Sequence, residues 1–173
     1  MNLNDIPVEK LMLKPVEIWN EWLLLTAGDY TAGEYNAMTI AWGSMGMMWG
    51  RPFVQVVVRP TRHTLSFMNR YDSFTVCGFG TGRREALSLL GSKSGRDGDK
   101  IAESGLTPVA ATNVAAPAFA EAELVIECTK AYTQQFDPAG FVAEYIEKCY
   151  NDDYHWAYFG EIAAVRGVSS YVR

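Results

Sequence analysis

The sequence has few of the residues that build metal centres and redox pairs. Its 173 residues include three cysteines, Cys77, Cys128 and Cys149, and two histidines, His63 and His155. No two cysteines form a CxxC pair, so zinc-knuckle and thioredoxin-like sites have no support. The two histidines lie far apart in the sequence and offer few metal ligands. The sequence therefore predicts no metal site.

Long apolar runs and basic segments are also missing. No apolar stretch approaches the roughly 18 residues that cross a membrane. The first ten residues, MNLNDIPVEK, lack the basic segment and apolar run of a signal peptide. A net charge of −5 argues against a nucleic-acid-binding surface. We therefore expect a protein of the reducing cytoplasm that binds neither membranes nor nucleic acid.

The composition is that of a globular protein. Hydrophobic residues make up 49% of the chain and charged residues 20%, which is too apolar for a disordered segment. A length of 173 residues suits one domain with one core. We therefore expect residues 1–173 to form a single domain.

Short strand-like segments dominate the pattern, with short helices in the connections. Strands are predicted at residues 22–27, 38–42, 53–59, 73–79, 123–129 and 154–165. Helices are predicted at residues 62–70, 83–90 and 138–150, the last after the helix-start pair Asp137-Pro138. There is no regular alternation of strand and helix, so the order favours a mainly β (α+β) fold with an antiparallel sheet or barrel.

The glycine-rich stretch GFGTGR at residues 78–83 is similar to a dinucleotide-binding fingerprint but does not match it. Arg83 stands where the third glycine belongs, and no Walker-type phosphate loop occurs elsewhere. We interpret the stretch as a turn after a strand, where glycine allows a tight backbone.

Two other segments offer groups that bind phosphate. In RPTRHT, at residues 59–64, two arginines and two threonines can donate to one phosphate, as can the N–H groups of a helix that follows. In GSKSGRDGDK, at residues 91–100, small residues let a ligand approach the backbone of a loop that carries three cations and two aspartates. The structural alternatives are a solvated turn for the first segment and a surface loop with self-compensating charges for the second.

Two further features concern ring binding and catalysis. The segment NAMTIAWGS, at residues 36–44, mixes polar, small and aromatic residues, as expected if a flat ligand lies along the strand with Trp42 or Trp49 as a wall. The alternative is a core tryptophan beside a bulge. His155 precedes a strand and has no nucleophile beside it, so a hydrolytic triad has no support.

Taken together, these segments resemble the flavin reductase-like family of FMN-binding split barrels, which includes flavoredoxins and the reductase components of two-component monooxygenases. The resemblance rests on NAMTIAWGSMG, WGRPFVQVVVRPTRHT, GSKSGRDGDK with the following ESGLTP, and HWAYFGEI. These segments run in family order from Asn36 to Ile162. The resemblance implies an FMN-binding split β-barrel that forms a homodimer with the flavin near the subunit interface.

The resemblance also implies roles for individual residues. Along the flavin ring lie Asn36, Ala37, Met38, Thr39, Ile40, Ala41 and Trp42. The phosphate is held by Arg59, Thr61 and Arg62. The ribityl-phosphate end is covered by Ser94, Gly95, Arg96, Asp97 and Lys100. His155, followed by Gly160, matches a histidine that contacts the nicotinamide donor, although Tyr154 replaces the glycine-aspartate that usually precedes it.

The implied activity is transfer of reducing equivalents from NADH or NADPH to FMN, as in a flavin reductase. One alternative is a flavoredoxin-type electron carrier, whose tightly bound FMN is reduced by a protein partner. A second is a non-catalytic flavin-binding module. A relative of pyridoxamine phosphate oxidase fits the four segments less well. The sequence leaves open the donor, the acceptor and whether FMN stays bound.

Overall fold

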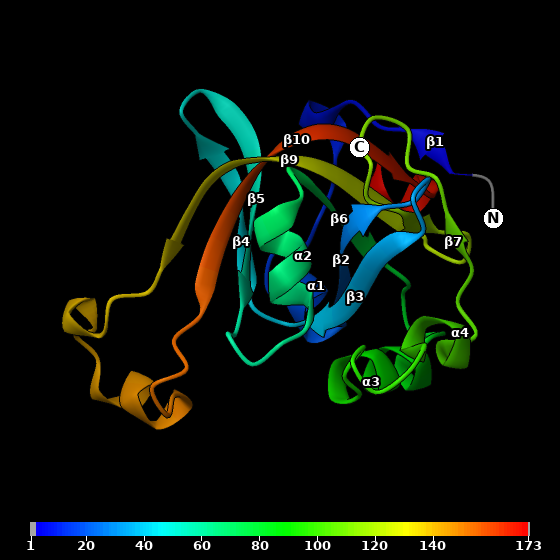
Figure 1. The fold of residues 1–173 in the computed structure, drawn as a ribbon. Coiled ribbons are helices and arrows are strands. Elements are labelled where there is room, and N and C mark those ends of the chain that lie inside the picture. Colours follow the sequence, from blue (N-terminus) through cyan, green and yellow to red (C-terminus); the bar gives the residue numbers. More distant parts are fainter. Residues whose placement is uncertain (1–2, 173) are drawn as a thin grey trace.

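The structure, a computed structural model, describes residues 3–172 and contains one large antiparallel sheet (Figure 1). Its strands follow the order β3-β2-β6-β9-β10-β5-β4, and β1 pairs with β10. The strands are β1 (Asn4–Asp5), β2 (Leu23–Asp29), β3 (Glu34–Ile40), β4 (Gly43–Met48), β5 (Arg51–Val58), β6 (Ser73–Gly78), β9 (Leu124–Gln135) and β10 (Trp156–Gly167). Within residues 3–172, β3 and β4 do not pair with each other, so the curved sheet stays open.

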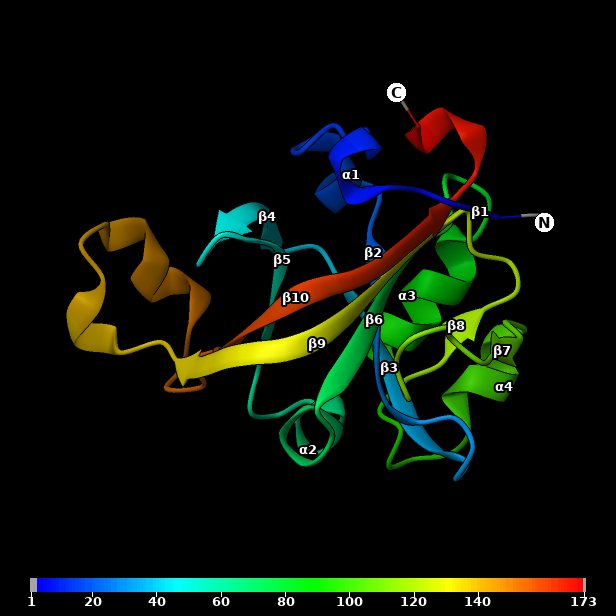
Figure 2. The same cartoon turned by 90° about the horizontal axis from the view of Figure 1, so that it is seen from above.

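Short helices fill the connections. The α-helices are α1 (Glu17–Asn20), α2 (Thr64–Arg70), α3 (Arg84–Ser92) and α4 (Lys100–Ser104). The 3₁₀ turns are Val8–Lys10, Pro138–Gly140, Glu144–Cys149 and Ser169–Tyr171, and β7 (Pro108–Val109) pairs with β8 (Ala118–Phe119). Figure 2 shows β9 and β10 crossing the molecule side by side, as their register also records. No helix within residues 3–172 is long and apolar enough to cross a membrane.

Strand β2, which lies between β3 and β6, is buried on both faces, which explains its continuous apolar run. Leu23 and Leu25 belong to one hydrophobic cluster, whereas Leu24 belongs to a second cluster on the opposite face. This division follows from the two-residue period of a strand. Leu87 and Leu90 of α3 join the second cluster, so this helix covers that face. The sheet thus provides a rigid base for the loops at its ends.

Most of the predicted strands and short helices are confirmed, with shifted ends. The predicted strand at 38–42 begins earlier, at Glu34, and ends at Ile40. The predicted strand at 22–27 extends further, because β2 continues through Gly28 and Asp29. GFGTGR is a turn after β6, with Gly80 at a φ of +56°. The sequence did not predict β4 or α4, since GSMGMM has little β-branched character and KIAES is short.

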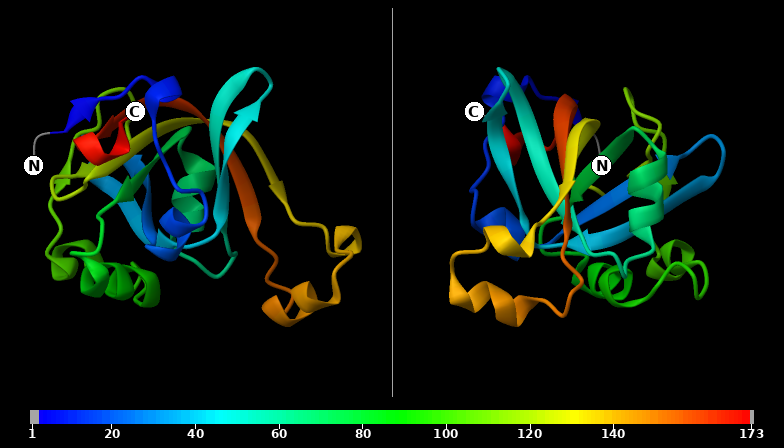
Figure 3. Two further views of the ribbon diagram at one scale, coloured as in Figure 1. Left: turned by 180° about the vertical axis from the view of Figure 1, so that it is seen from behind. Right: turned by 60° about the vertical axis from the view of Figure 1, so that its left-hand side comes forward.

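The predicted helix at 138–150 is wrong. Residues Pro138–Gly140 and Glu144–Cys149 form separate 3₁₀ turns, although Asp137 does cap the first by accepting from the Ala139 N–H. Val142 and Tyr145 are 97% and 73% exposed, so an amphipathic helix would have no core to pack against here. The segment between β9 and β10 instead projects from the sheet (Figures 1 and 3).

Candidate functional site

Two adjoining cavities lie where β5 ends, beside β3 and the start of β10. Both are open to solvent; the narrow cavity has a volume of about 180 Å³ and the basic cavity one of about 540 Å³. Both are lined by Met38, Arg59 and Arg62. The sequence segments from β3 and from the end of β5, which are separate along the chain, therefore meet at one place.

The narrow cavity combines apolar and small side chains with two arginines and a histidine. It is formed by Met38, Thr39, Ile40, Ala41, Trp42, Val57, Arg59, Arg62 and His155. Strand β3 pairs only with β2 among the described strands, so its second edge carries no strand partner. Backbone N–H and C=O groups along that edge can bind the polar rim of a flat ring, and Trp42 offers an aromatic face. The cavity thus suits a planar ligand.

The basic cavity gathers cations and hydroxyl groups from two segments. After β5 come Arg59, Thr61, Arg62, His63 and Thr64. The stretch from the end of α3 to the start of α4 adds Ser92, Lys93, Ser94 and Lys100. Asp153 supplies the carboxylate of this lining. The excess of positive charge and the hydroxyl donors favour a phosphate-bearing ligand.

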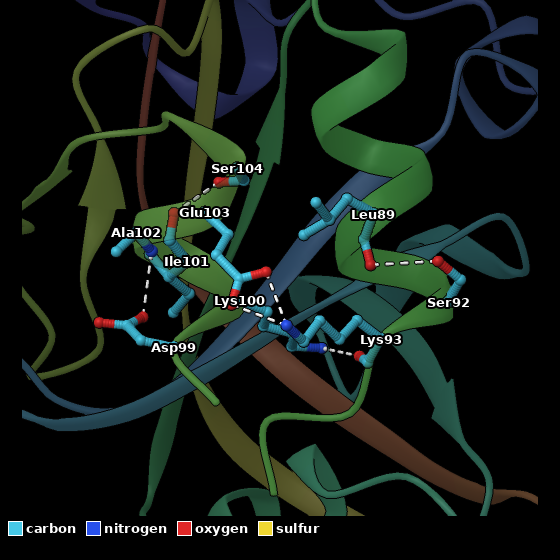
Figure 4. Close-up of polar contacts among 9 residues, drawn as sticks. All are labelled: Leu89, Ser92, Lys93, Asp99, Lys100, Ile101, Ala102, Glu103 and Ser104. Carbon is cyan, nitrogen blue, oxygen red and sulfur yellow. Dashed lines mark hydrogen bonds and ion pairs between the residues drawn. The ribbon is translucent and has the colours of Figure 1, made fainter. Parts of the chain in front are cut away.

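Lys100 is the most deeply buried cation of the basic cavity, with only 4% of the residue exposed. Its Nζ donates to the carbonyl oxygens of Leu90 and Lys93, at 2.9 and 3.0 Å (Figure 4 includes the bond to Lys93). No carboxylate of residues 3–172 forms an ion pair with it. Burial, helped by Arg62, lowers the pKa of Lys100 to about 8. A buried ammonium without an acid is costly, and an anion in the cavity would offset that cost.

The two arginines differ in how firmly they are engaged. Arg62 donates through Nη1 to the Gly91 carbonyl at 2.7 Å. Arg59 donates through Nη1 to Asp153 Oδ2 and through Nη2 to the Cys149 carbonyl, both at 2.6 Å. The charge of Arg59 is therefore already paired with Asp153, whereas Arg62 lines both cavities and forms no ion pair with any acid of residues 3–172.

His155 forms one wall of the narrow cavity and is 7% exposed. Its Nδ1 lies 2.9 Å from the Tyr150 hydroxyl, and its ring centroid lies 5.3 Å from that of Trp42. Burial, followed by the charge of Arg59, lowers the pKa of His155 to about 4, although Asp153 acts in the opposite direction. His155 is therefore a neutral imidazole near pH 7.

Eleven of the sixteen residues that the resemblance indicated line the cavities. These are Met38, Thr39, Ile40, Ala41, Trp42, Arg59, Thr61, Arg62, Ser94, Lys100 and His155. Asn36 and Ala37 are buried, and Asn36 donates at 2.7 Å to Oγ1 of Thr64, a residue that lines the basic cavity. Gly95 packs against Asn36 and His63, whereas Arg96 and Asp97 are exposed. These five residues line neither cavity.

Some side chains of the 91–100 loop make contacts within the loop and α4 that the sequence did not predict. Asp99 caps α4 by accepting from the Ala102 N–H at 3.0 Å, and Lys93 pairs with Glu103 at 2.6 Å (Figure 4). The charges of this loop are thus partly self-compensating, as the structural alternative proposed. The sequence did not predict that Val57 lines the narrow cavity, because the orientation of its side chain depends on strand register. It also did not single out Ser92, although this residue lies in the candidate phosphate-binding segment GSKSGRDGDK.

Potential metal ligands do not cluster in this part of the molecule or elsewhere within residues 3–172. No group of three or more histidine, cysteine, aspartate or glutamate side chains could hold a metal ion there. The described cavities present cations and apolar walls instead.

Comparison with known proteins identifies both the family and the fold. Residues 20–170 match the model of the flavin reductase like domain. No curated protein sequence matches the chain.

Solved structures extend the comparison to nearly the whole chain. A flavoredoxin from Methanosarcina acetivorans is 23% identical, with a TM-score of 0.68 over 100% of this chain and 76% of its own. The flavoredoxin of Desulfovibrio vulgaris (Miyazaki F) is 23% identical, with a TM-score of 0.67 over 94% and 75%. A split-barrel-domain protein from Shewanella frigidimarina is 17% identical, with a TM-score of 0.68 over 86% and 67%. With the open antiparallel sheet, these likenesses confirm the predicted split β-barrel.

Proposed function

The chain belongs to the flavin reductase-like family, and on that basis we propose that it binds FMN and reduces it with NADH or NADPH. The family match supports an oxidoreductase in general terms. The cavities support the more specific assignment, because one suits a planar ring and the adjoining one suits a phosphate. FMN combines these two chemical groups in one molecule.

Lys100 carries the proposal. It is buried, it is paired with no acid of residues 3–172, and it lines the basic cavity next to Arg62. A phosphate dianion would supply the missing countercharge, with Thr61 and Ser94 as additional donors. The residues present therefore fit the phosphate of FMN.

The protein's own residues bind and orient the flavin, which supplies the hydride-accepting chemistry when it is bound. The 38–42 segment supports the ring, and Arg62 and Lys100 hold the phosphate. His155, neutral near pH 7, forms the wall beside Trp42 where a nicotinamide ring would lie. Hydride transfer needs no acid–base pair, so a neutral imidazole is suited to contact rather than to proton transfer.

The test is a comparison of FMN with riboflavin, which has the same ring and no phosphate. Titration of each flavin into the full chain, followed by flavin fluorescence, gives both dissociation constants. Two charge-assisted contacts of about 1.5–3 kcal/mol each predict that FMN binds at least about 100-fold more tightly. Equal affinity for the two flavins would contradict the assignment of the basic cavity to phosphate.

A second candidate is a flavoredoxin-type carrier whose bound FMN is reduced by a protein partner. The likeness to two flavoredoxins favours it. Tight FMN binding with no prompt oxidation of NADH or NADPH would support the carrier, or a non-catalytic flavin-binding module if no protein donor reduces the flavin. We further propose that the protein is cytoplasmic and forms a homodimer, and sedimentation of the purified chain would test the homodimer.

A further inference from the structure

The segment between β9 and β10, residues 136–155, forms an arm that projects from the sheet and returns to it at the start of β10 (Figures 1 and 3). Its outer part is exposed, with Val142 at 97% and Tyr145 at 73%. Its returning part contains Tyr150, Asp153 and His155, and the last two line the cavities. The positions of Asp153 and His155 in the cavities therefore depend on contacts between this returning part and the sheet.

Arg59 holds the returning arm at three points. It immediately follows β5 on the body, yet its two terminal nitrogens donate to Asp153 Oδ2 and to the Cys149 carbonyl, each at 2.6 Å. Its guanidinium carbon also lies 5.3 Å from the centroid of the Tyr150 ring. Arg59 and Asp153 are both partly buried, with 30% and 21% of their side chains exposed. A partly buried fork of this kind is stronger than an exposed ion pair.

The contacts of Arg59 continue to the narrow cavity through the arm. The Tyr150 hydroxyl lies 2.9 Å from His155 Nδ1, and the two rings meet edge to face with centroids 5.4 Å apart. His155 in turn lies against Trp42. Displacement of Tyr150 would therefore remove both the hydrogen bond and the packing that fix the imidazole ring.

We propose that Arg59 is a positioning residue, which clasps the returning arm to the body and thereby seats His155 in the wall of the narrow cavity. The proposal rests on the proposed function and deepens it. It assigns to Arg59 the recognition of the nicotinamide donor through His155, and it leaves the phosphate charge to Arg62 and Lys100. Both terminal nitrogens of Arg59 are already bound, which separates its role from that of Arg62.

The ionisation of His155 reports the clasp directly. Its imidazole faces Arg59 and Arg62, which lower its pKa together with burial, as well as Asp153, which raises it, and Tyr150 at its Nδ1. Replacement of Arg59 by glutamine removes one lowering charge, frees Asp153 and lets water reach the ring. All three changes act in one direction, so the pKa of His155 should rise from about 4 toward its ordinary value of 6.5.

The first experiment uses the full chain without flavin. The protein has two histidines, so ring signals of His63 and His155 can be followed by NMR during a pH titration. Arg59→Gln should raise the pKa of His155 toward its ordinary value. Asp153→Asn breaks the same ion pair from the arm but removes a carboxylate that raises this pKa, so a rise in that variant would report loosening of the arm. Arg51→Gln is the matched control, because Arg51 lies at the start of β5 in an exposed pair with Glu161.

The second experiment measures FMN affinity and NAD(P)H kinetics. We expect Arg59→Gln to raise the KM for the donor about 10-fold, the loss of one positioned contact, with less than about 3-fold effect on the Kd for FMN. Arg62→Gln should instead raise the Kd for FMN and leave the KM for the donor nearly unchanged. An unchanged His155 titration in both Arg59→Gln and Asp153→Asn would overturn the clasp, as would a loss of FMN affinity in Arg59→Gln equal to that in Arg62→Gln. If the wild type binds no FMN, the proposed function fails, while the titration still decides the clasp.

Discussion

The buried ammonium of Lys100 makes FMN affinity depend on pH. In the ligand-free protein its pKa is lowered to about 8, chiefly by burial. A phosphate dianion bound beside it would favour the charged form and return the pKa toward its ordinary value of 10.5. Binding then requires a protonated Lys100, and affinity must fall as the pH rises above 8.

The magnitude follows from those two pKa values. Between about pH 8 and pH 10.5 the free protein has lost the proton that the complex keeps, so Kd rises about 10-fold per pH unit. Full restoration of the ordinary pKa predicts that FMN binds roughly 20-fold more weakly at pH 9.5 than at pH 7.5, or about 2 kcal/mol. The FMN phosphate itself does not titrate in this range, because its second pKa lies near 6.

The assay is a titration of FMN into the full chain at pH 7.5, 8.5 and 9.5, followed by flavin fluorescence. Lys100→Met should bind FMN weakly and with a flat pH dependence. Lys130→Met is the matched control, since Lys130 is a partly buried lysine that donates to the Met68 carbonyl at 2.6 Å and lies outside both cavities. A wild-type Kd that stays constant from pH 7.5 to 9.5, or the same pH slope in Lys100→Met, would refute the reasoning.

Three further predictions concern single substitutions. Arg62→Ala removes a charged phosphate contact and should cost about 1.5–3 kcal/mol of FMN binding, so the variant should purify nearly colourless; a variant as yellow as the wild type would remove Arg62 from the site. His155→Ala should slow turnover with NADH or NADPH while FMN remains bound, and unchanged steady-state kinetics would remove its role. Gly160→Ala places a Cβ 2.5 Å from Phe74 Cζ and 2.7 Å from Cys128 Cβ, and overpacking should lower the free energy of unfolding by about 1–3 kcal/mol. An unchanged midpoint in urea would contradict that last prediction.

The sequence was sufficient to predict a strand where the local residue pattern agrees with the burial of that strand. The run at 22–27 predicted β2 because both faces of that strand are buried. RPTRHT and GSKSGRDGDK were singled out because phosphate-binding residue types are concentrated there, and both segments contribute residues to the lining of the basic cavity. The family resemblance added the order of the segments, and the family is confirmed over residues 20–170.

The sequence was insufficient where a contact depends on distant segments. Arg59 binds Cys149 and Asp153, which lie 90 and 94 positions further along the chain. No local sequence pattern records contacts of that separation. Asn36, which the resemblance placed along the flavin ring, donates to Thr64 Oγ1, a contact between β3 and α2 that no local pattern records. The periodicity at 138–150 suggested a helix, although apolar spacing stabilises a helix only when a core lies beside it.

Reduction of the bound flavin tests the central claim most directly. The full chain is loaded with FMN, freed of oxygen and mixed with NADH or with NADPH while the flavin absorbance bands are recorded. The account predicts prompt bleaching with at least one of the two nucleotides, slowed in His155→Ala. Flavin bands that persist with both nucleotides and bleach only with dithionite would contradict the reductase assignment.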